Sequence, residues 1–475
     1  MSARWHRSVS LLRGLSLAGA LLLSCSSSNS SNSSNSTSSG GTESDGGGGK
    51  PSPVDHGPPN THFESTNASW AVPPRGVQSG FQTVAGSYWA TMDLNGDSKP
   101  DLIYTDEQDS NGVWGGDGAA YWKVFLNTGA GFATSAVKWS VPARGVQTGF
   151  QTVAGAYWAT MDLDGDDKPD LVYTNEVDSK GVWGGDAAAH WKVYLNTGSG
   201  FASKATSWSV PARGVQNGFE SVAGKYWATM DLDGDGKPDL VYTNEADSQG
   251  VWGGDGAAYW KVFLNTGSGF ASTATHWAVP ARGTANGFAS IADGSFWTTM
   301  DLDGDDKPDL VYTAEQDSNG VWGGDGAAYW KVFLNTGSGF AAKASSWSIP
   351  ARGVTSGFET ASGSYWATTD LDGDGKVDLV YTNEADSKGV WGGDGAAYWR
   401  VFLNTGSGFA PKAAHWSIPA RGVQGGFQTV AGDHWATTDL DGDGKADLVY
   451  TNEVDSNGVW GGDSAAHWKL YLGKP

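Results

Sequence analysis

The stretch Asp231–Leu240, with the sequence DLDGDGKPDL, places four aspartates within nine positions. Carboxylates this close together repel one another unless a cation lies between them. Nearly the same string recurs along the chain, and its first residue is Asp93, Asp162, Asp231, Asp301, Asp370 and Asp439 in turn. These positions are 69 or 70 residues apart, and a fixed period predicts a repeat architecture of six units.

Each unit has the composition of short strands joined by turns. Runs rich in Val, Tyr, Phe, Trp and Thr alternate with clusters of Gly, Asn, Asp and Pro, and no apolar 3.6 period persists. In the third unit we expect strands at about Tyr226–Met230, Leu240–Thr243 and Tyr259–Asn265, and a fourth running into Trp277–Val279, with NTGSGF as the turn before it. Six such units predict an all-β fold, a six-bladed β-propeller of four-stranded blades.

The two ends of the repeat array predict that the ring closes. The SWxVP pattern of the fourth strand occurs at Trp70, before the first aspartate string, whereas the chain stops at HWKLYLGKP with no such strand after it. Residues 61–73 are therefore expected to complete the last blade, which leaves no open repeat end. An open solenoid is the alternative, but it needs distinct capping repeats, and the sequence contains none.

The aspartates at positions 1, 3, 5 and 9 of each string are candidate calcium ligands, because Ca²⁺ takes six to eight oxygen ligands. Position 12 is Tyr242 rather than glutamate, so the loop is no EF-hand, and the Lys237 carbonyl is expected as a backbone ligand. Asn95 replaces one carboxylate in the first loop and should weaken that site. The predicted ligands are Asp93, Asn95, Asp97 and Asp101; Asp162, Asp164, Asp166 and Asp170; Asp231, Asp233, Asp235 and Asp239; Asp301, Asp303, Asp305 and Asp309; Asp370, Asp372, Asp374 and Asp378; and Asp439, Asp441, Asp443 and Asp447.

The combination of DLDGDGKPDLVY and VFLNTGSGF resembles the FG-GAP and VCBS repeats of bacterial surface proteins. The aspartate string is also similar to the DxDxDGxxD calcium loops of integrin α-subunit propellers. This resemblance covers all six units, residues 61–475, and implies a propeller that holds up to six structural Ca²⁺ ions.

The N-terminus predicts export. Residues 1–24 carry three arginines and then a short apolar run, as signal peptides do. The tetrad that ends at Cys25 resembles a lipoprotein lipobox, which implies lipidation of Cys25 and, with Ser26 next to it, an outer-membrane or cell-surface location; an ordinary signal peptide and an extracellular location are the alternative. Residues 25–60, rich in Ser, Asn and Gly, are expected to form a disordered tether.

Charge and cysteine content exclude several partners. The formal net charge of -22 excludes a general affinity for nucleic acid or anionic lipid. The membrane is therefore expected to be reached only through the lipid anchor. A single cysteine excludes an intramolecular disulfide and a cysteine-based zinc site. We expect a monomer.

A second set of candidate residues lies in the connections at the opposite end of the blades from the aspartate loops. These connections combine tryptophans, carboxylates and arginines, which suits a neutral polyol such as a sugar. The alternative is that these groups pair with one another and pack between blades. The candidates are Trp114, Asp117, Trp183, Asp186, Trp252, Asp255, Trp322, Asp325, Trp391, Asp394, Trp460 and Asp463, with Arg144, Arg213, Arg282, Arg352 and Arg421.

Three functions are compatible with these features. The first is a multivalent binding or adhesion module for carbohydrate, because duplicated units produce equivalent sites. The second is adhesion to, or scaffolding of, a cell-surface protein. The third is a hydrolase or lyase, but His190, His276, His415, His434 and His467 are scattered without a nucleophile motif, so no catalytic residue is assigned and no enzyme is expected.

Overall fold

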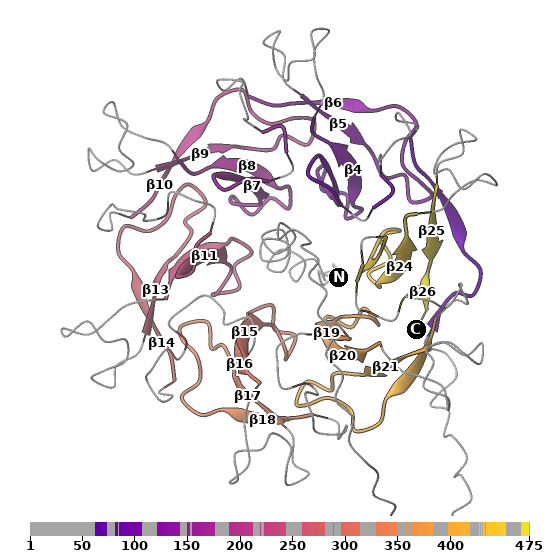
Figure 1. Ribbon diagram of the computed structural model, residues 1–475. Coiled ribbons are helices and arrows are strands. Elements are labelled where there is room, and N and C mark those ends of the chain that lie inside the picture. Colours follow the sequence, from indigo (N-terminus) through magenta and orange to yellow (C-terminus); the bar gives the residue numbers. More distant parts are fainter. Residues whose placement is uncertain are drawn as a thin grey trace, which may run out of the picture.

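The protein forms a ring of six antiparallel four-stranded sheets around a central axis (Figure 1). This computed structural model describes residues 62–73, 81–83, 85–106, 121–142, 150–152, 154–175, 190–211, Phe219, 223–243, 259–280, Phe288, 296–313, 329–349, Phe358, Gly363, 365–382, 398–418, Phe427, Thr429, 431–432, 434–452 and 467–474. The six-bladed β-propeller predicted from the repeat period is confirmed. Within these residues no helix is long and apolar enough to cross a membrane.

The innermost strands line the central axis and the outermost strands form the rim (Figure 1). The first strands of blades one to six are β3 (Trp89–Met92), β7 (Trp158–Met161), β11 (Trp227–Met230), β15 (Trp297–Met300), β19 (Trp366–Thr369) and β23 (Trp435–Thr438). The second strands are β4 (Asp101–Tyr104), β8 (Asp170–Tyr173), β12 (Asp239–Tyr242), β16 (Asp309–Tyr312), β20 (Asp378–Tyr381) and β24 (Asp447–Tyr450).

The outer half of each blade has the same plan. The third strands are β5 (Tyr121–Phe125), β9 (His190–Tyr194), β13 (Tyr259–Phe263), β17 (Tyr329–Phe333), β21 (Tyr398–Phe402) and β25 (His467–Tyr471). The fourth strands are β6 (Val137–Ser140), β10 (Thr206–Ser209), β14 (Thr275–Ala278), β18 (Ser345–Ser348) and β22 (Ala414–Ser417) in blades one to five, and β2 (Ala68–Ala71) in blade six.

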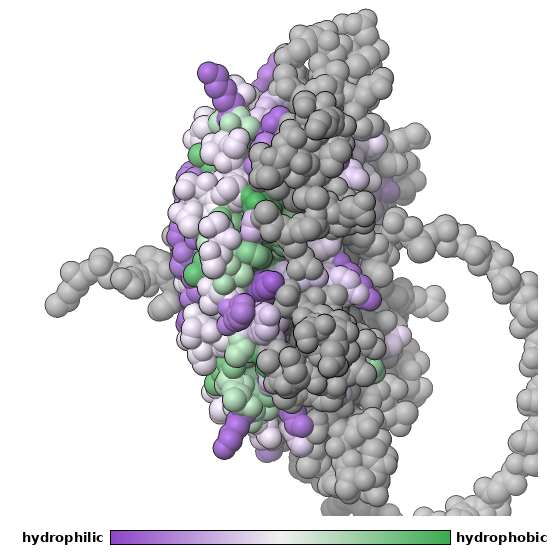
Figure 2. All heavy atoms as spheres, turned by 90° about the vertical axis from the view of Figure 1, so that its left-hand side faces the viewer, coloured by the Kyte–Doolittle hydropathy of each residue, from purple (hydrophilic) through white to green (hydrophobic). Residues whose placement is uncertain are grey.

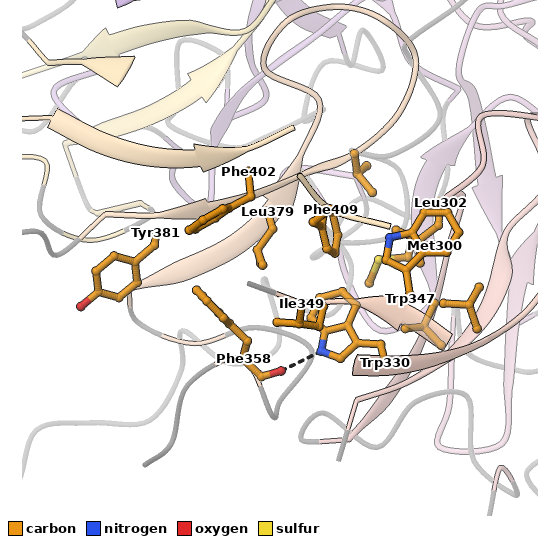
Figure 3. Close-up of a cluster of buried hydrophobic side chains, with 13 residues drawn as sticks. Met300, Leu302, Trp330, Trp347, Ile349, Phe358, Leu379, Tyr381, Phe402 and Phe409 are labelled. Atoms are coloured by element: carbon orange, nitrogen blue, oxygen red, sulfur yellow. Dashed lines mark hydrogen bonds between the residues drawn. The ribbon is translucent and has the colours of Figure 1, made fainter. Parts of the chain in front are cut away.

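Apolar side chains fill the space between neighbouring blades. The second strands are buried on both faces because each lies between two other sheets. In the cluster between blades four and five, the Trp330 indole donates from Nε1 to the Phe358 carbonyl at 2.7 Å (Figure 3). Phe358 is fully buried and has a φ of 57°, a left-handed conformation that costs a bulky residue about 1 kcal/mol or more. This hydrogen bond therefore helps to hold a strained position, and it recurs in all six blades.

The ring closes as predicted through β2, which pairs with β25 in blade six. The structure adds a second closing contact. Two further short strands, β1 (His62–Phe63) and β26 (Gly473–Lys474), pair with each other, and β1 also pairs with β22 of blade five. Residues 61–73 therefore do not all join the last blade, because His62 and Phe63 extend the sheet of blade five.

The two short strands rebuild a turn that the other blades form from continuous chain. In blades one to five the turn after the third strand carries a phenylalanine whose N–H bonds the end of the preceding blade's fourth strand, as Phe270 bonds Ser209 at 3.0 Å. In blade six Phe63 takes this place, and its ring lies edge-on to Trp399 at 5.5 Å and to Trp416 at 5.9 Å. The turn is thus split between the two ends of the chain.

The loops that join first to second strands lie at the same end of the blades as the turns that join third to fourth strands. Asn265, in such a turn, lies next to Asp239, which ends the aspartate loop of its own blade. Seen edge-on, hydrophilic residues lie along one face of the disc (Figure 2), as expected where Asp, Asn and Lys side chains gather.

Candidate functional site

The aspartate loops bring carboxylates together at one end of the propeller. In four loops the aspartates at positions 1, 3 and 9 each place an oxygen within 4.8 Å of the others. In blade five the grouped residues are at positions 1, 3 and 5. These triads, which could hold a metal ion, are Asp162, Asp164 and Asp170; Asp231, Asp233 and Asp239; Asp301, Asp303 and Asp309; Asp370, Asp372 and Asp374; and Asp439, Asp441 and Asp447.

The aspartate at position 1 shapes the loop. Asp231 accepts backbone N–H bonds from Gly234 at 2.8 Å, Asp235 at 3.2 Å and Gly236 at 2.8 Å. Gly234 and Gly236 have φ values of 79° and 87°, which glycine adopts at low cost. Burial raises the pKa of the Asp231 carboxyl, although the amide hydrogen bonds oppose that change. The sequence therefore folds the loop around its first carboxylate.

The aspartate at position 9 is the most buried of each set. Asp239 is 1% exposed and accepts the N–H of Leu232 at 3.2 Å and of Asn265 at 2.8 Å, one on each carboxylate oxygen. Burial raises the pKa of Asp239 to about 7, and the charges of Asp233 and Asp231 act in the same direction. A buried carboxylate of this kind requires a proton or a cation near neutral pH.

In blades two and four the aspartate at position 3 supplies an oxygen that lacks a partner, whereas in blades three, five and six the equivalent Oδ1 accepts the N–H of the position 5 aspartate at 3.1 to 3.2 Å. Oδ1 of Asp164 and Oδ1 of Asp303 are buried and make no hydrogen bond. Burial also raises the pKa of both carboxyls. A buried, unpartnered carboxylate oxygen is costly, and a cation in contact with all three members of the triad would satisfy it. The donor set therefore fits a metal ion.

The aspartate at position 5 pairs with a lysine instead. Lys237 Nζ lies 2.9 Å from Asp235 Oδ2, and the equivalent pairs in the second, fourth, fifth and sixth loops measure 2.8 to 3.1 Å. The sequence grouped position 5 with the other three ligands. The structure brings it into a triad only in blade five, where Asp374 also pairs with Lys376 at 2.9 Å.

The first loop differs from the other five at position 3, and the weaker metal site expected there stays a prediction. Asn95 replaces the carboxylate at position 3, and its Nδ2 donates to Asp97 at 3.3 Å. Asp93 and Asp101 keep the same backbone hydrogen bonds as their equivalents. Among the described residues, the triads come from the other five loops.

The predicted ligand site at the opposite end lies outside the described residues. This applies to Trp114, Asp117, Trp183, Asp186, Trp252, Asp255, Trp322, Asp325, Trp391, Asp394, Trp460, Asp463, Arg144, Arg213, Arg282, Arg352 and Arg421, and to Cys25 with residues 1–61.

Described residues at that end include aromatic side chains to which the sequence assigned no role. Tyr88, Tyr157 and Phe296 are 37 to 40% exposed and directly precede the first strands of blades one, two and four. The backbone beneath them is fixed, since the Tyr88 carbonyl accepts from both N–H and Oγ1 of the buried Thr105. The signal in the sequence is a Tyr or Phe before the Trp of the first strand in five blades, with His434 at this position in blade six.

Three of the histidines contact neighbouring groups, although His276 is exposed and His415 only half-buried. His276 stacks on Tyr259 with ring centroids 4.2 Å apart, and His415 stacks on Tyr398 at 4.4 Å. His434 Nδ1 lies 2.9 Å from the Gln82 carbonyl oxygen. In the part of the chain that the structure describes, no metal-compatible group includes a histidine.

Two solved structures are similar to this chain in part. One is the Tc holotoxin pore of Photorhabdus luminescens, at 17% identity over 87% of this chain and 15% of the toxin chain, with a TM-score of 0.49. The other is an Agrocybe aegerita lectin that recognises non-reducing terminal N-acetylglucosamine, at 18% identity over 77% of this chain and 75% of the lectin, with a TM-score of 0.42. This chain thus spans only 15% of the length of the toxin chain. Comparison with curated proteins gives no match.

The FG-GAP-like repeat family matches residues 162–242 and residues 370–450. Each match runs from the aspartate loop of one blade to the second strand of the next, through blades two and three and through blades five and six. The remaining blades repeat the same strands and loops. The resemblance inferred from the aspartate strings is confirmed in these two stretches, and the chain is a six-bladed β-propeller that contains FG-GAP-like repeats.

Proposed function

We propose that the aspartate loops hold structural Ca²⁺. The support is the donor set: three carboxylates whose oxygens lie within 4.8 Å of one another, which suits Ca²⁺ with its six to eight oxygen ligands, whereas Mg²⁺ is usually bound through one or two carboxylates and keeps several waters. Bound Ca²⁺ would supply positive charge to buried carboxylates such as Asp239 and a partner for the Asp164 Oδ1 atom. The ion has a stabilising role in this proposal, and no reaction is assigned to it.

We further propose that the chain is a multivalent binding module for carbohydrate. The observation that carries this proposal is the separation of the two ends of the blades. One end is occupied by aspartate loops that bond to one another and to the neighbouring blades, whereas the other presents Tyr88, Tyr157 and Phe296 half-exposed on a fixed backbone. Exposed aromatic rings stack on the apolar faces of sugars.

The repeats make weak sites useful. Six equivalent blades place copies of one site around a rigid ring, so a branched or surface-bound glycan can engage several at once. Linked binding of this kind raises avidity by about 10²- to 10⁴-fold without any new contact. Export and lipidation at Cys25, which the N-terminal sequence predicts, would hold the ring at a cell surface.

The test is binding of the full chain to a printed glycan array in Ca²⁺, and again after chelation. The matched variant replaces Trp252 and its five equivalents by Ala, and a second variant replaces Tyr88 and Tyr157 by Ala. Selective glycan binding that either variant loses, while thermal unfolding stays unchanged, supports the proposal. A folded, calcium-loaded protein that binds no glycan contradicts it and favours adhesion to a cell-surface protein.

A further inference from the structure

One buried asparagine in each of blades one to five connects two aspartate loops. Asn265 follows the third strand of blade three and is 6% exposed. Its backbone N–H donates to Asp239 Oδ1 in its own blade at 2.8 Å, and its side-chain Nδ2 donates to the Leu163 carbonyl of blade two at 2.9 Å. The amide is fixed further, because Oδ1 accepts the Gly267 N–H at 2.9 Å.

The residue that accepts this bond lies inside the neighbouring triad. Leu163 stands between Asp162 and Asp164, and its own N–H donates to Oδ2 of Asp170 at 3.2 Å. Asn265 therefore contacts a triad member of its own blade and the backbone between two triad members of the preceding blade. It links the two candidate metal sites through two hydrogen bonds.

The same connection recurs with nearly constant geometry. The side-chain donor lies 2.8 to 2.9 Å from the leucine carbonyl oxygen of the preceding blade at each of Asn127, Asn196, Asn265, Asn335 and Asn404. The backbone N–H of each lies 2.8 to 2.9 Å from the position 9 aspartate of its own blade.

We propose that these asparagines couple the metal sites, so that cation binding to the loops is cooperative; this inference rests on the proposed calcium function of the triads. Ordering of Asp162 and Asp164 fixes the Leu163 carbonyl between them. That carbonyl orients Asn265, and Asn265 in turn holds Asp239 of the next triad. A site that is already ordered lowers the ordering entropy that its neighbour must lose, and this coupling is reciprocal.

The connection is missing at one junction. Blade six has Gly473 at the asparagine position, where the N–H still bonds Asp447 at 3.0 Å but no side chain can reach blade five. An added Cβ would lie 2.5 Å from the Ala446 carbonyl oxygen, so the position admits only glycine. The hydrogen-bonded array is therefore linear in the order five, four, three, two, one, six, although the ring is closed.

The test is a calorimetric titration of the metal-free full chain with CaCl₂. The wild type is expected to show a Hill coefficient above 1, with each connected site binding about 5-fold or more tightly once its neighbour is filled, the lower end of the usual coupling range. Asn265→Ala splits the array into two sets of three and should lower that coefficient without changing the number of ions bound. The triple variant of Asn196, Asn265 and Asn335 to Ala leaves two linked pairs of loops, five with four and one with six. Because the first loop holds no triad, only one linked pair of triads remains, and the coefficient should fall further.

The control is the triple variant of Thr197, Thr266 and Thr336 to Ala. Each threonine follows its asparagine, and its hydroxyl bonds only within its own turn: to the glycine carbonyl at 2.7 to 2.8 Å and, for Thr197 and Thr336, to a serine hydroxyl at 3.4 to 3.5 Å. A lower Hill coefficient in the asparagine variants but not in this control supports the coupling. A wild-type coefficient of 1, or an equal decrease in both triple variants, overturns the coupling and leaves the calcium proposal standing. No calcium binding at all overturns both proposals.

Discussion

Removal of Ca²⁺ should destabilise the propeller by an amount that follows from the number of triads. At free Ca²⁺ ten times the dissociation constant, each occupied site stabilises the folded form by about 1.4 kcal/mol, and five sites by about 7 kcal/mol. The unfolding entropy of roughly 410 residues is about 0.9 kcal/mol/K, so Tm should rise by about 8 °C between excess chelator and that Ca²⁺ concentration.

The assay is calorimetric melting of the full chain at a series of free Ca²⁺ concentrations. Asp233→Ala removes one triad and should reduce the calcium increment, the rise in Tm between excess chelator and Ca²⁺, by about a fifth, because the other four triads are unchanged. Asp235→Ala is the matched control. It removes the ion pair with Lys237 and the hydrogen bond from the Lys237 N–H to Asp235 Oδ1 at 2.9 Å, but no triad member, and should leave the calcium-dependent rise in Tm unchanged.

Two results would refute this reasoning. An equal Tm in chelator and in Ca²⁺ means that the triads bind no calcium at these concentrations. A larger loss of the increment in Asp235→Ala than in Asp233→Ala means that position 5, not position 3, is the ligand.

Three further outcomes follow from single contacts. Burial raises the pKa of Asp239 to about 7, so between about pH 4 and pH 7 the folded form keeps a proton that the unfolded form loses. The Tm of the metal-free protein should therefore fall as the pH rises from about 4 to about 7. Saturating Ca²⁺ should abolish or reverse that fall. Trp260→Phe leaves the buried Phe288 carbonyl without its donor. It should lower the free energy of unfolding, measured in urea, by about 1–3 kcal/mol more than Trp277→Phe does, because Nε1 of Trp277 has no partner to lose. Phe63→Ala should lower the free energy of unfolding by about 3–5 kcal/mol and speed amide hydrogen exchange only in blades five and six. Equally faster exchange in all six blades would show that Phe63 does not act at this junction.

The blade plan was predictable because each strand is a local pattern. The expected strands of blade three differ from β11, β12, β13 and β14 by one or two residues at most of their ends. One shift has a physical reason. The second strand begins at Asp239 rather than Leu240, because the last aspartate of the loop pairs with Met230 across the sheet.

The contacts between blades were not predictable from the sequence. Asn265 and Leu163 are 102 residues apart, and the conformation of NTGSGF alone does not say which carbonyl the asparagine reaches. The pairing of Lys237 with Asp235 was missed for a different reason. Four carboxylates in one string suggested one shared cation, but residues two apart in a tight turn can pair with each other instead.

The split turn shows how a closed ring of repeats differs from the sum of its units. At five junctions an asparagine and a phenylalanine from the turn after the third strand both contact the preceding blade. At the junction between blades five and six, Phe63 still packs on the preceding blade, but the asparagine bond is lost at Gly473. A surface ion pair between Lys474 and Glu64 at 3.1 Å adds little in its place, because solvent screens exposed pairs.

The division of the propeller into two ends also constrains where a partner can bind. At the aspartate end, carboxylates, asparagines and lysines bond to the loops of their own and neighbouring blades, and Lys307 packs so closely over Gly234 of the preceding blade that an added Cβ there would lie 2.9 Å from it. A partner that competed for these groups would have to replace contacts that hold the blades together. The opposite end carries exposed rings such as Tyr157, whose backbone carbonyl already accepts from Thr174, so a ligand could stack on the ring without displacing that hydrogen bond. Recognition at that end and metal binding at the other are therefore compatible in one rigid ring.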